Sequence, residues 1–211
     1  MRAWRLLPWL IIYAVAMAYV ESAVVVYLRA LYFPQGFAFP LVPLPPDMLA
    51  IEIGREVAAL VVLLGVAMLA GAERWDRLLV LGVIFGVWDL FYYVWLWVLL
   101  RWPPSPLTWD VLFLIPVPWT GPVLAPAVVS AVLVTGGLLL LRKGARGEPI
   151  VFPIPLRILA LAGAVFVLGS FVLDSPIALR QLEPPPFRWG LFGTGVGLAV
   201  AALVLALRKK V

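Results

Sequence analysis

Three ionisable residues lie close together in the stretch IEIGREVAAL, which covers residues 51–60 of a strongly apolar segment. Glu52 and Glu56 are four residues apart and Arg55 follows Glu52 by three, so on a helix all three side chains share a face. Carboxylates placed in this way can bind a cation, transfer a proton or pair with the arginine. Because ionisable residues are costly inside a bilayer, such residues in a membrane span indicate a functional site.

Two neighbouring apolar segments carry an acid at a similar depth. Counted at about 1.5 Å per residue from the outer ends of their predicted helices, Glu56 lies about 12 Å deep and Glu21 and Asp89 lie about 16 Å deep. We therefore expect these three carboxylates to meet at one level, with Glu52 and Arg55 nearer the surface.

Other polar side chains flank this level. Gly82, Gly86, Asp89 and Tyr93 form a small and polar stripe on one helix face, with Tyr92 alongside, and the stripe should face protein. We expect the two tyrosines to be hydrogen-bond partners in the site. Asp110 either joins the site from the following segment or caps a short helix after Thr108.

The buried charges do not balance. Arg55 and Arg29 can neutralise only two of the four acids Glu21, Glu52, Glu56 and Asp89, and each ionised group at mid-membrane costs about 2.5–3.5 kcal/mol. Protonation, a bound cation or water must offset the surplus. Oxygen ligands suit Mg²⁺, Ca²⁺ or Mn²⁺, so Glu21, Glu56 and Asp89 are predicted as metal ligands or proton carriers. For Glu52 and Arg55, a purely structural ion pair is the alternative.

The composition is that of an integral membrane protein. Of the 211 residues, 64% are hydrophobic and 13% are charged, and apolar runs recur along the whole chain. The chain has no Cys and no His, which excludes disulfides, a Ser-His-Asp triad and haem or zinc held by those ligands. The lack of Asn and the two Gln suit a thermophile, although a GC-rich genome would have the same effect.

Hydropathy predicts an all-α polytopic membrane protein that forms a single transmembrane domain over residues 1–211. From Thr108 to Arg142 the apolar stretch is too long for one crossing, and the prolines of IPVPWTGPVLAP break it. We expect a short segment over about 107–115, an irregular elbow and then the fourth span. The six predicted spans cover about 4–32, 48–71, 78–100, 122–142, 155–174 and 187–207.

The basic residues set the orientation. With both termini cytoplasmic in the inner (plasma) membrane, eleven Lys and Arg lie inside and three lie in outer loops, as the positive-inside rule requires. The inner set is Arg2, Arg5, Arg74, Arg77, Arg142, Lys143, Arg146, Arg157, Arg208, Lys209 and Lys210; the outer set is Arg101, Arg180 and Arg188. Because topology explains the net charge of +5, we expect a lipid bilayer and no nucleic acid as partner.

The run VWDLFYYVWLWVLLRWPPSPLTWDVLFLIPVPWTGPVLAP, residues 87–126, resembles a pattern in uncharacterised bacterial multi-span membrane proteins. The resemblance covers about a fifth of the chain and implies a membrane location but no activity.

Two functions of different classes follow from these residues. The first is an outward-facing intramembrane carboxylate site that binds a cation or a polar substrate, for transport or metal-assisted chemistry, although no nucleophile motif accompanies it. The second is a non-catalytic membrane subunit or anchor that binds lipid, quinone or carotenoid and assembles with copies of itself or a larger complex. The sequence leaves open whether the protein is an enzyme.

Overall fold

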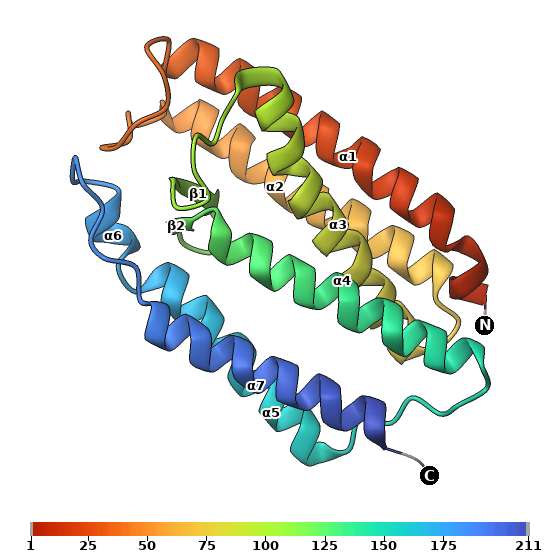
Figure 1. Cartoon of the computed structure of the whole chain (residues 1–211). Coiled ribbons are helices and arrows are strands. Elements are labelled where there is room, and N and C mark those ends of the chain that lie inside the picture. The colour runs from red at the N-terminus through yellow and green to blue at the C-terminus, as the bar shows by residue number, and fades with distance from the viewer. Residues whose placement is uncertain (1, 210–211) are drawn as a thin grey trace.

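The computed structural model describes residues 2–209 and consists mainly of six long helices (Figure 1). Each is long and apolar enough to cross a membrane, which is compatible with a multi-pass integral membrane protein. The long helices are α1 (Arg2–Tyr32), α2 (Pro46–Ala70), α3 (Arg74–Leu100), α4 (Leu124–Ala145), α5 (Ile154–Val172) and α7 (Trp189–Arg208); α6 (Ser175–Ala178) is a single turn. The ends of the long helices agree with the predicted spans to within about four residues.

The segment before α4 differs from the prediction of an irregular elbow. Strands β1 (Trp109–Phe113) and β2 (Trp119–Pro122) pair antiparallel, with Asp110 opposite Gly121, and form a small hairpin. The alternative in which Asp110 caps a short helix is wrong, because Asp110 lies within β1. As expected, no helix runs through Pro116 and Pro118, and α4 begins only at Leu124. Pairing of the two strands satisfies backbone hydrogen bonds in this segment.

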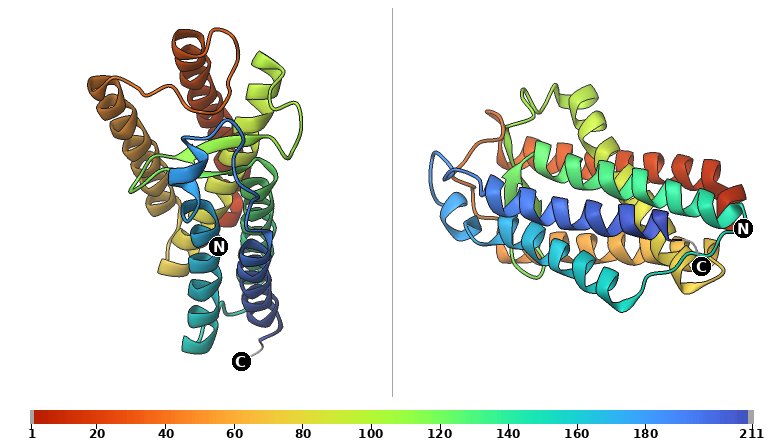
Figure 2. Two further views of the ribbon diagram at one scale, coloured as in Figure 1. Left: turned by 90° about the vertical axis from the view of Figure 1, so that its left-hand side faces the viewer. Right: turned by 60° about the horizontal axis from the view of Figure 1, so that its bottom comes forward.

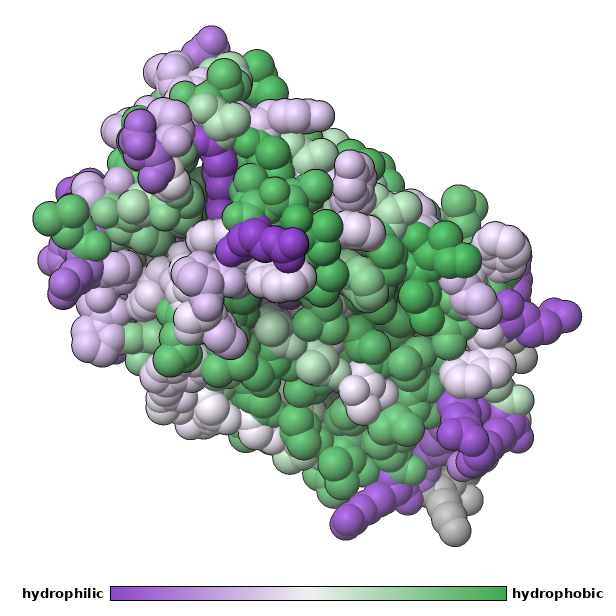
Figure 3. Space-filling model, turned by 45° about the horizontal axis from the view of Figure 1, so that its top comes forward, coloured by the Kyte–Doolittle hydropathy of each residue, from purple (hydrophilic) through white to green (hydrophobic). Residues whose placement is uncertain are grey.

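The helices run roughly along one direction, with the hairpin and α6 at one end and both termini at the other (Figures 1 and 2). Hydrophobic residues cover the middle of the face shown in Figure 3, and hydrophilic residues gather toward its two ends. This is the surface pattern of a protein that crosses a bilayer.

The main hydrophobic core lies among α1, α2, α3 and α4. Ala14 and Ala18 of α1, Leu63 of α2 and Ile84 of α3 are fully buried in it. In each of the first three helices these residues lie on the side toward the termini, and the acids of the predicted site lie nearer the hairpin.

At Gly86, close contact between α3 and α4 shows that this part of the glycine stripe faces protein. A Cβ atom on Gly86 would approach the carbonyl oxygen of Ser130 to 2.7 Å and Val134 Cγ2 to 2.8 Å. Only glycine allows this approach, which places Ser130 beside the next polar position of α3, Asp89.

Candidate functional site

One cavity of about 160 Å³ lies between α1, α2, α3 and β1 at the hairpin end of the molecule. All eight residues predicted from the sequence line it. They are Glu21 of α1, Glu52, Arg55 and Glu56 of α2, Asp89, Tyr92 and Tyr93 of α3, and Asp110 of β1. The structure therefore brings together side chains from four elements that the sequence placed by depth and by helix face, and it includes Asp110, whose role the sequence left open.

Arg55 joins two of the helices. Its Nε and Nη2 atoms donate to the two carboxylate oxygens of Glu52 on the same helix, with Nε at 2.9 Å from Oε2, and its Nη1 donates to Glu21 on α1. The side chains of Glu21 and Glu52 are each 10% exposed. Glu52 and Arg55 thus form an ion pair, and its extension to Glu21 ties α1 to α2.

Glu56 joins α2 to the hairpin. Both of its carboxylate oxygens accept the backbone N–H of Leu114, at 3.1 and 2.9 Å, directly after the end of β1. Within residues 2–209, Glu56 has no basic side chain within ion-pair distance. The N–H dipole of Leu114 and the longer-range attraction of Arg55 therefore stabilise its negative charge.

Asp89 joins α3 to α4. Its Oδ2 atom accepts the hydroxyl of Ser130 at 2.8 Å, and Ser130 is 1% exposed. Like Glu56, Asp89 forms no ion pair with a basic residue in the described part of the chain. A carboxylate with a single hydroxyl donor keeps several lone pairs free for a ligand.

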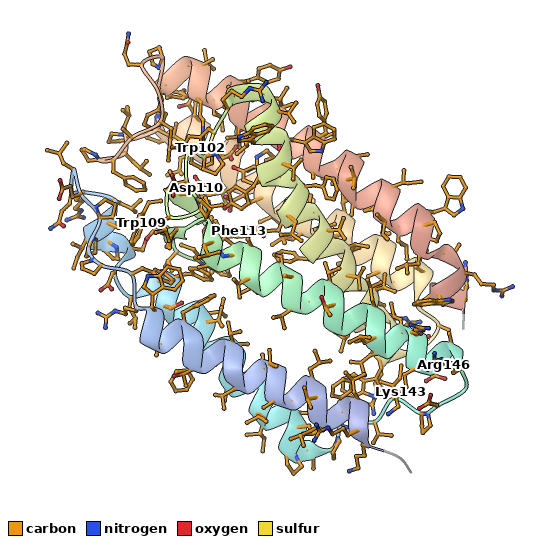
Figure 4. The ribbon with its side chains drawn as sticks, viewed as in Figure 1. Trp102, Trp109, Asp110, Phe113, Lys143 and Arg146 are labelled. Carbon is orange, nitrogen blue, oxygen red and sulfur yellow. The ribbon has the colours of Figure 1, made fainter. Side chains whose placement is uncertain are left out.

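Arg29 and Asp110 form another part of the cavity wall. Arg29 Nη2 lies 3.4 Å from Asp110 Oδ1, and the guanidinium carbon lies 3.7 Å from the ring centre of Trp102 and 4.3 Å from that of Phe37. The two rings hold this cation by cation–π attraction, which compensates for a long ion pair. Figure 4 shows Asp110 and Trp102 together at the hairpin end.

Two buried polar atoms of the cavity wall lack a hydrogen-bond partner among residues 2–209. They are Oδ2 of Asp110, an acceptor, and Nε1 of Trp88, a donor. Burial raises the pKa of Asp110, which lies on the hairpin outside the six long helices, to about 6, although Arg29 opposes this shift. Buried polar groups without a partner are costly, so each of these two atoms would gain from a polar partner in the cavity.

The cavity has more acidic than basic side chains. Five carboxylates line it, from Glu21, Glu52, Glu56, Asp89 and Asp110, against the two guanidinium groups of Arg29 and Arg55. The excess predicted from the sequence is therefore present in one place. A positively charged occupant would lower the electrostatic energy of the site.

The acids do not form a metal centre by themselves. Within residues 2–209, no group of three or more acidic side chains is close enough together to hold a metal ion. Glu21, Glu56 and Asp89, the predicted metal ligands, each have a different partner, namely Arg55, Leu114 and Ser130. They line the same cavity without converging on one point.

Arg29 and Phe37, which line the cavity, and Ser130 and Trp102, which contact lining residues from outside it, were not among the predicted site residues. Arg29 was predicted only as a counter-charge, and neither Ser130 nor the aromatic pair Phe37 and Trp102 was predicted to take part. A lone serine in the apolar segment APAVVSAV was a usable signal, because a polar side chain in a span seeks a partner. Nothing local in the sequence places Phe37 against Arg29.

No family model, curated protein or solved structure matches this chain.

Proposed function

We propose that the protein is a membrane-embedded binding protein for a small organic cation, such as an alkylammonium or guanidinium ion. The observation that carries the proposal is the excess of carboxylates around one cavity, five against two guanidinium groups. Glu56 and Asp89, which form no ion pair with a basic residue within residues 2–209, would bind the cation.

The size of the cavity supports an organic ion. Its volume of about 160 Å³ is close to the roughly 150 Å³ of an engineered apolar cavity that holds benzene, so a molecule of about six non-hydrogen atoms fits. The separate partners of Glu21, Glu56 and Asp89 favour an ion that makes several spaced hydrogen bonds over a metal ion that needs converging ligands. Trp88, Tyr92 and Tyr93 add aromatic faces for its alkyl part and its charge.

We further propose that the cavity opens to the outside of the cell membrane. The cavity lies at the end opposite the termini, and the end with the termini carries most of the lysines and arginines. In this orientation, extracellular cations reach the site without crossing the apolar core.

The test is to titrate purified full-length protein in detergent with three probes of nearly equal size, n-butylammonium, n-butanol and butyrate, by calorimetry. We expect saturable binding of butylammonium, weaker binding of butanol and none of butyrate. Asp89→Asn and Glu56→Gln should each weaken the binding of butylammonium about tenfold or more, because each removes a negative charge beside the ligand.

Glu183→Gln is the matched control, since Glu183 is exposed at the same end and does not line the cavity. Equal affinity for all three probes would overturn the proposal. Binding of Mg²⁺ or Ca²⁺ with no binding of butylammonium would replace the organic ion with a metal ion.

A further inference from the structure

A second cavity, which shares no lining residue with the acidic cavity, lies between α3 and α4 on one side and α5 and α7 on the other. Its volume is about 420 Å³ and every residue that lines it is apolar. It extends along α4 from Val129 to Leu140, which is about 16 Å of helix. We call this space the apolar groove.

Small side chains keep the groove open. Gly82 of α3 and Ala164 of α5 both line it. A Cβ atom on Gly82 would meet only Leu133 Cδ2, at 3.7 Å, which is an ordinary contact, so the groove has space at this position. The width of the groove therefore depends on the small size of the residues at these helix positions.

One end of the groove is bordered by aromatic rings. Phe152 lines the groove and its ring packs on that of Trp75, with the ring centres 4.7 Å apart. Trp75 is in the first turn of α3, at the end of the molecule that carries the termini. Tryptophan in this position is typical of the boundary between the hydrocarbon and the lipid headgroups.

Two arginines converge on the same tryptophan. The guanidinium carbons of Arg74 and Arg157 each lie 5.3 Å from the ring centre of Trp75. Both side chains are exposed. Within residues 2–209, neither is within ion-pair distance of a carboxylate. This holds even though Glu73 and Asp76 lie next to Arg74 in the chain. Arg157 Nε donates to the carbonyl oxygen of Phe152, a neutral acceptor. Two positive charges beside one ring, neither in an ion pair in this part of the chain, favour an anion there.

We propose that the apolar groove and this arginine pair bind an anionic phospholipid. An acyl chain lies in the groove, and the phosphate interacts with Arg74 and Arg157 beside Trp75. The charge of the headgroup complements the arginines, and the chain covers apolar surface that the helices leave open. This site is independent of the cation cavity, which lies at the other end of the molecule.

The test uses full-length protein in detergent, titrated with phosphatidylglycerol or phosphatidylcholine that carry the same acyl chains, with bound lipid counted by native mass spectrometry. We expect at least a fivefold preference for phosphatidylglycerol. The double variant R74Q/R157Q should lose this preference, whereas R142Q/R146Q, which removes two exposed charges at the same end, should keep it.

A second pair of variants tests the groove itself. Gly82→Leu should reduce the binding of both lipids by filling the groove, whereas Gly197→Leu, in open space on α7 and outside the groove, should not. A preference that survives in R74Q/R157Q overturns the proposal. Binding of glycerol phosphate as tight as that of the lipid would also overturn it. A lipid-free dimer in which a second copy covers the groove would do the same.

Discussion

At the scale of single residues, the acids of the cavity have three kinds of partner: guanidinium, backbone N–H and hydroxyl. Glu21 and Glu52 share the guanidinium of Arg55, Glu56 accepts a backbone N–H and Asp89 accepts a hydroxyl. This division lets one cavity hold several carboxylates without a counter-ion for each. It also predicts that substitutions of these residues and of their partners will differ in the stability that they remove.

Arg55 should matter most for stability. Replacing it with methionine leaves two buried carboxylates without their cation, so we expect a loss of about 3 kcal/mol, seen as a lower melting temperature in detergent. Adding Glu21→Gln and Glu52→Gln to Arg55→Met should restore most of the loss. A stable Arg55→Met protein would show that the three charges are solvated rather than paired.

Asp110 should make cation binding depend on pH. Because burial raises its pKa to about 6, the carboxyl group loses its proton as the pH rises from 5 to 7, and each ionised group adds attraction for a cation. Arg29, Asp89, Tyr92 and Tyr93 are the charged and titratable groups around it. We expect the affinity for butylammonium to rise over this range, and part of that rise to be missing in Asp110→Asn. A butanol titration, which should not change with pH, is the control.

At the scale of elements, two polar contacts of the site fix the hairpin to the helices. Glu56 accepts the N–H of Leu114, and Arg29 pairs with Asp110. The same groups that give the cavity its charge therefore also position its wall.

Substitution of Glu56 can separate these two roles. Glu56→Ala removes the acceptor, so amide exchange over residues 109–122 should rise about tenfold or more. Glu56→Gln keeps an acceptor oxygen and should leave most of this protection, although it weakens cation binding. Hydrogen exchange with mass spectrometry measures both, and equal protection in the alanine variant would show that the hairpin does not need Glu56.

The close contact of α3 with α4 at Gly86 should make this position sensitive to substitution. Gly86→Ala places a methyl group 2.7 Å from the carbonyl oxygen of Ser130, so we expect a loss of about 1–3 kcal/mol of stability and a weaker Asp89 site. Gly54→Ala, which meets nothing within 4 Å on α2, should be neutral or slightly stabilising. Thermal unfolding of the two variants in detergent gives the comparison.

The sequence predicted the helices and the meeting of the acids, but not what replaces the helix after α3. Span length and hydropathy place Glu21, Glu56 and Asp89 at one depth, because helix rise is constant. The prolines near residue 116 mark where a helix must stop. Whether strands then form depends on pairing between residues 109–113 and 119–122. The pattern of residue types within either stretch does not predict that pairing.

At the scale of the whole molecule, the proposed orientation follows from charges at its two ends. In Figure 4, Lys143 and Arg146 lie at the end with the termini, opposite Asp110 and Trp102. In the orientation that we propose from the positive-inside rule, that end lies in the cytoplasm.

The lack of cysteine makes the orientation directly testable. Single substitutions Glu183→Cys and Glu148→Cys put one thiol near each end of an otherwise cysteine-free chain. In intact cells, a membrane-impermeant maleimide should label position 183, and position 148 should react only after the cells are opened. The reverse pattern would turn the cation cavity toward the cytoplasm.

The fully buried Ala14, Ala18, Leu63 and Ile84 lie between the acidic cavity and the end with the termini. Fully buried apolar side chains leave no polar partners for a file of water, so we expect that protons and small ions do not cross from the cavity to the end with the termini in this conformation. A cell could therefore carry many copies of the protein without draining its electrochemical gradient.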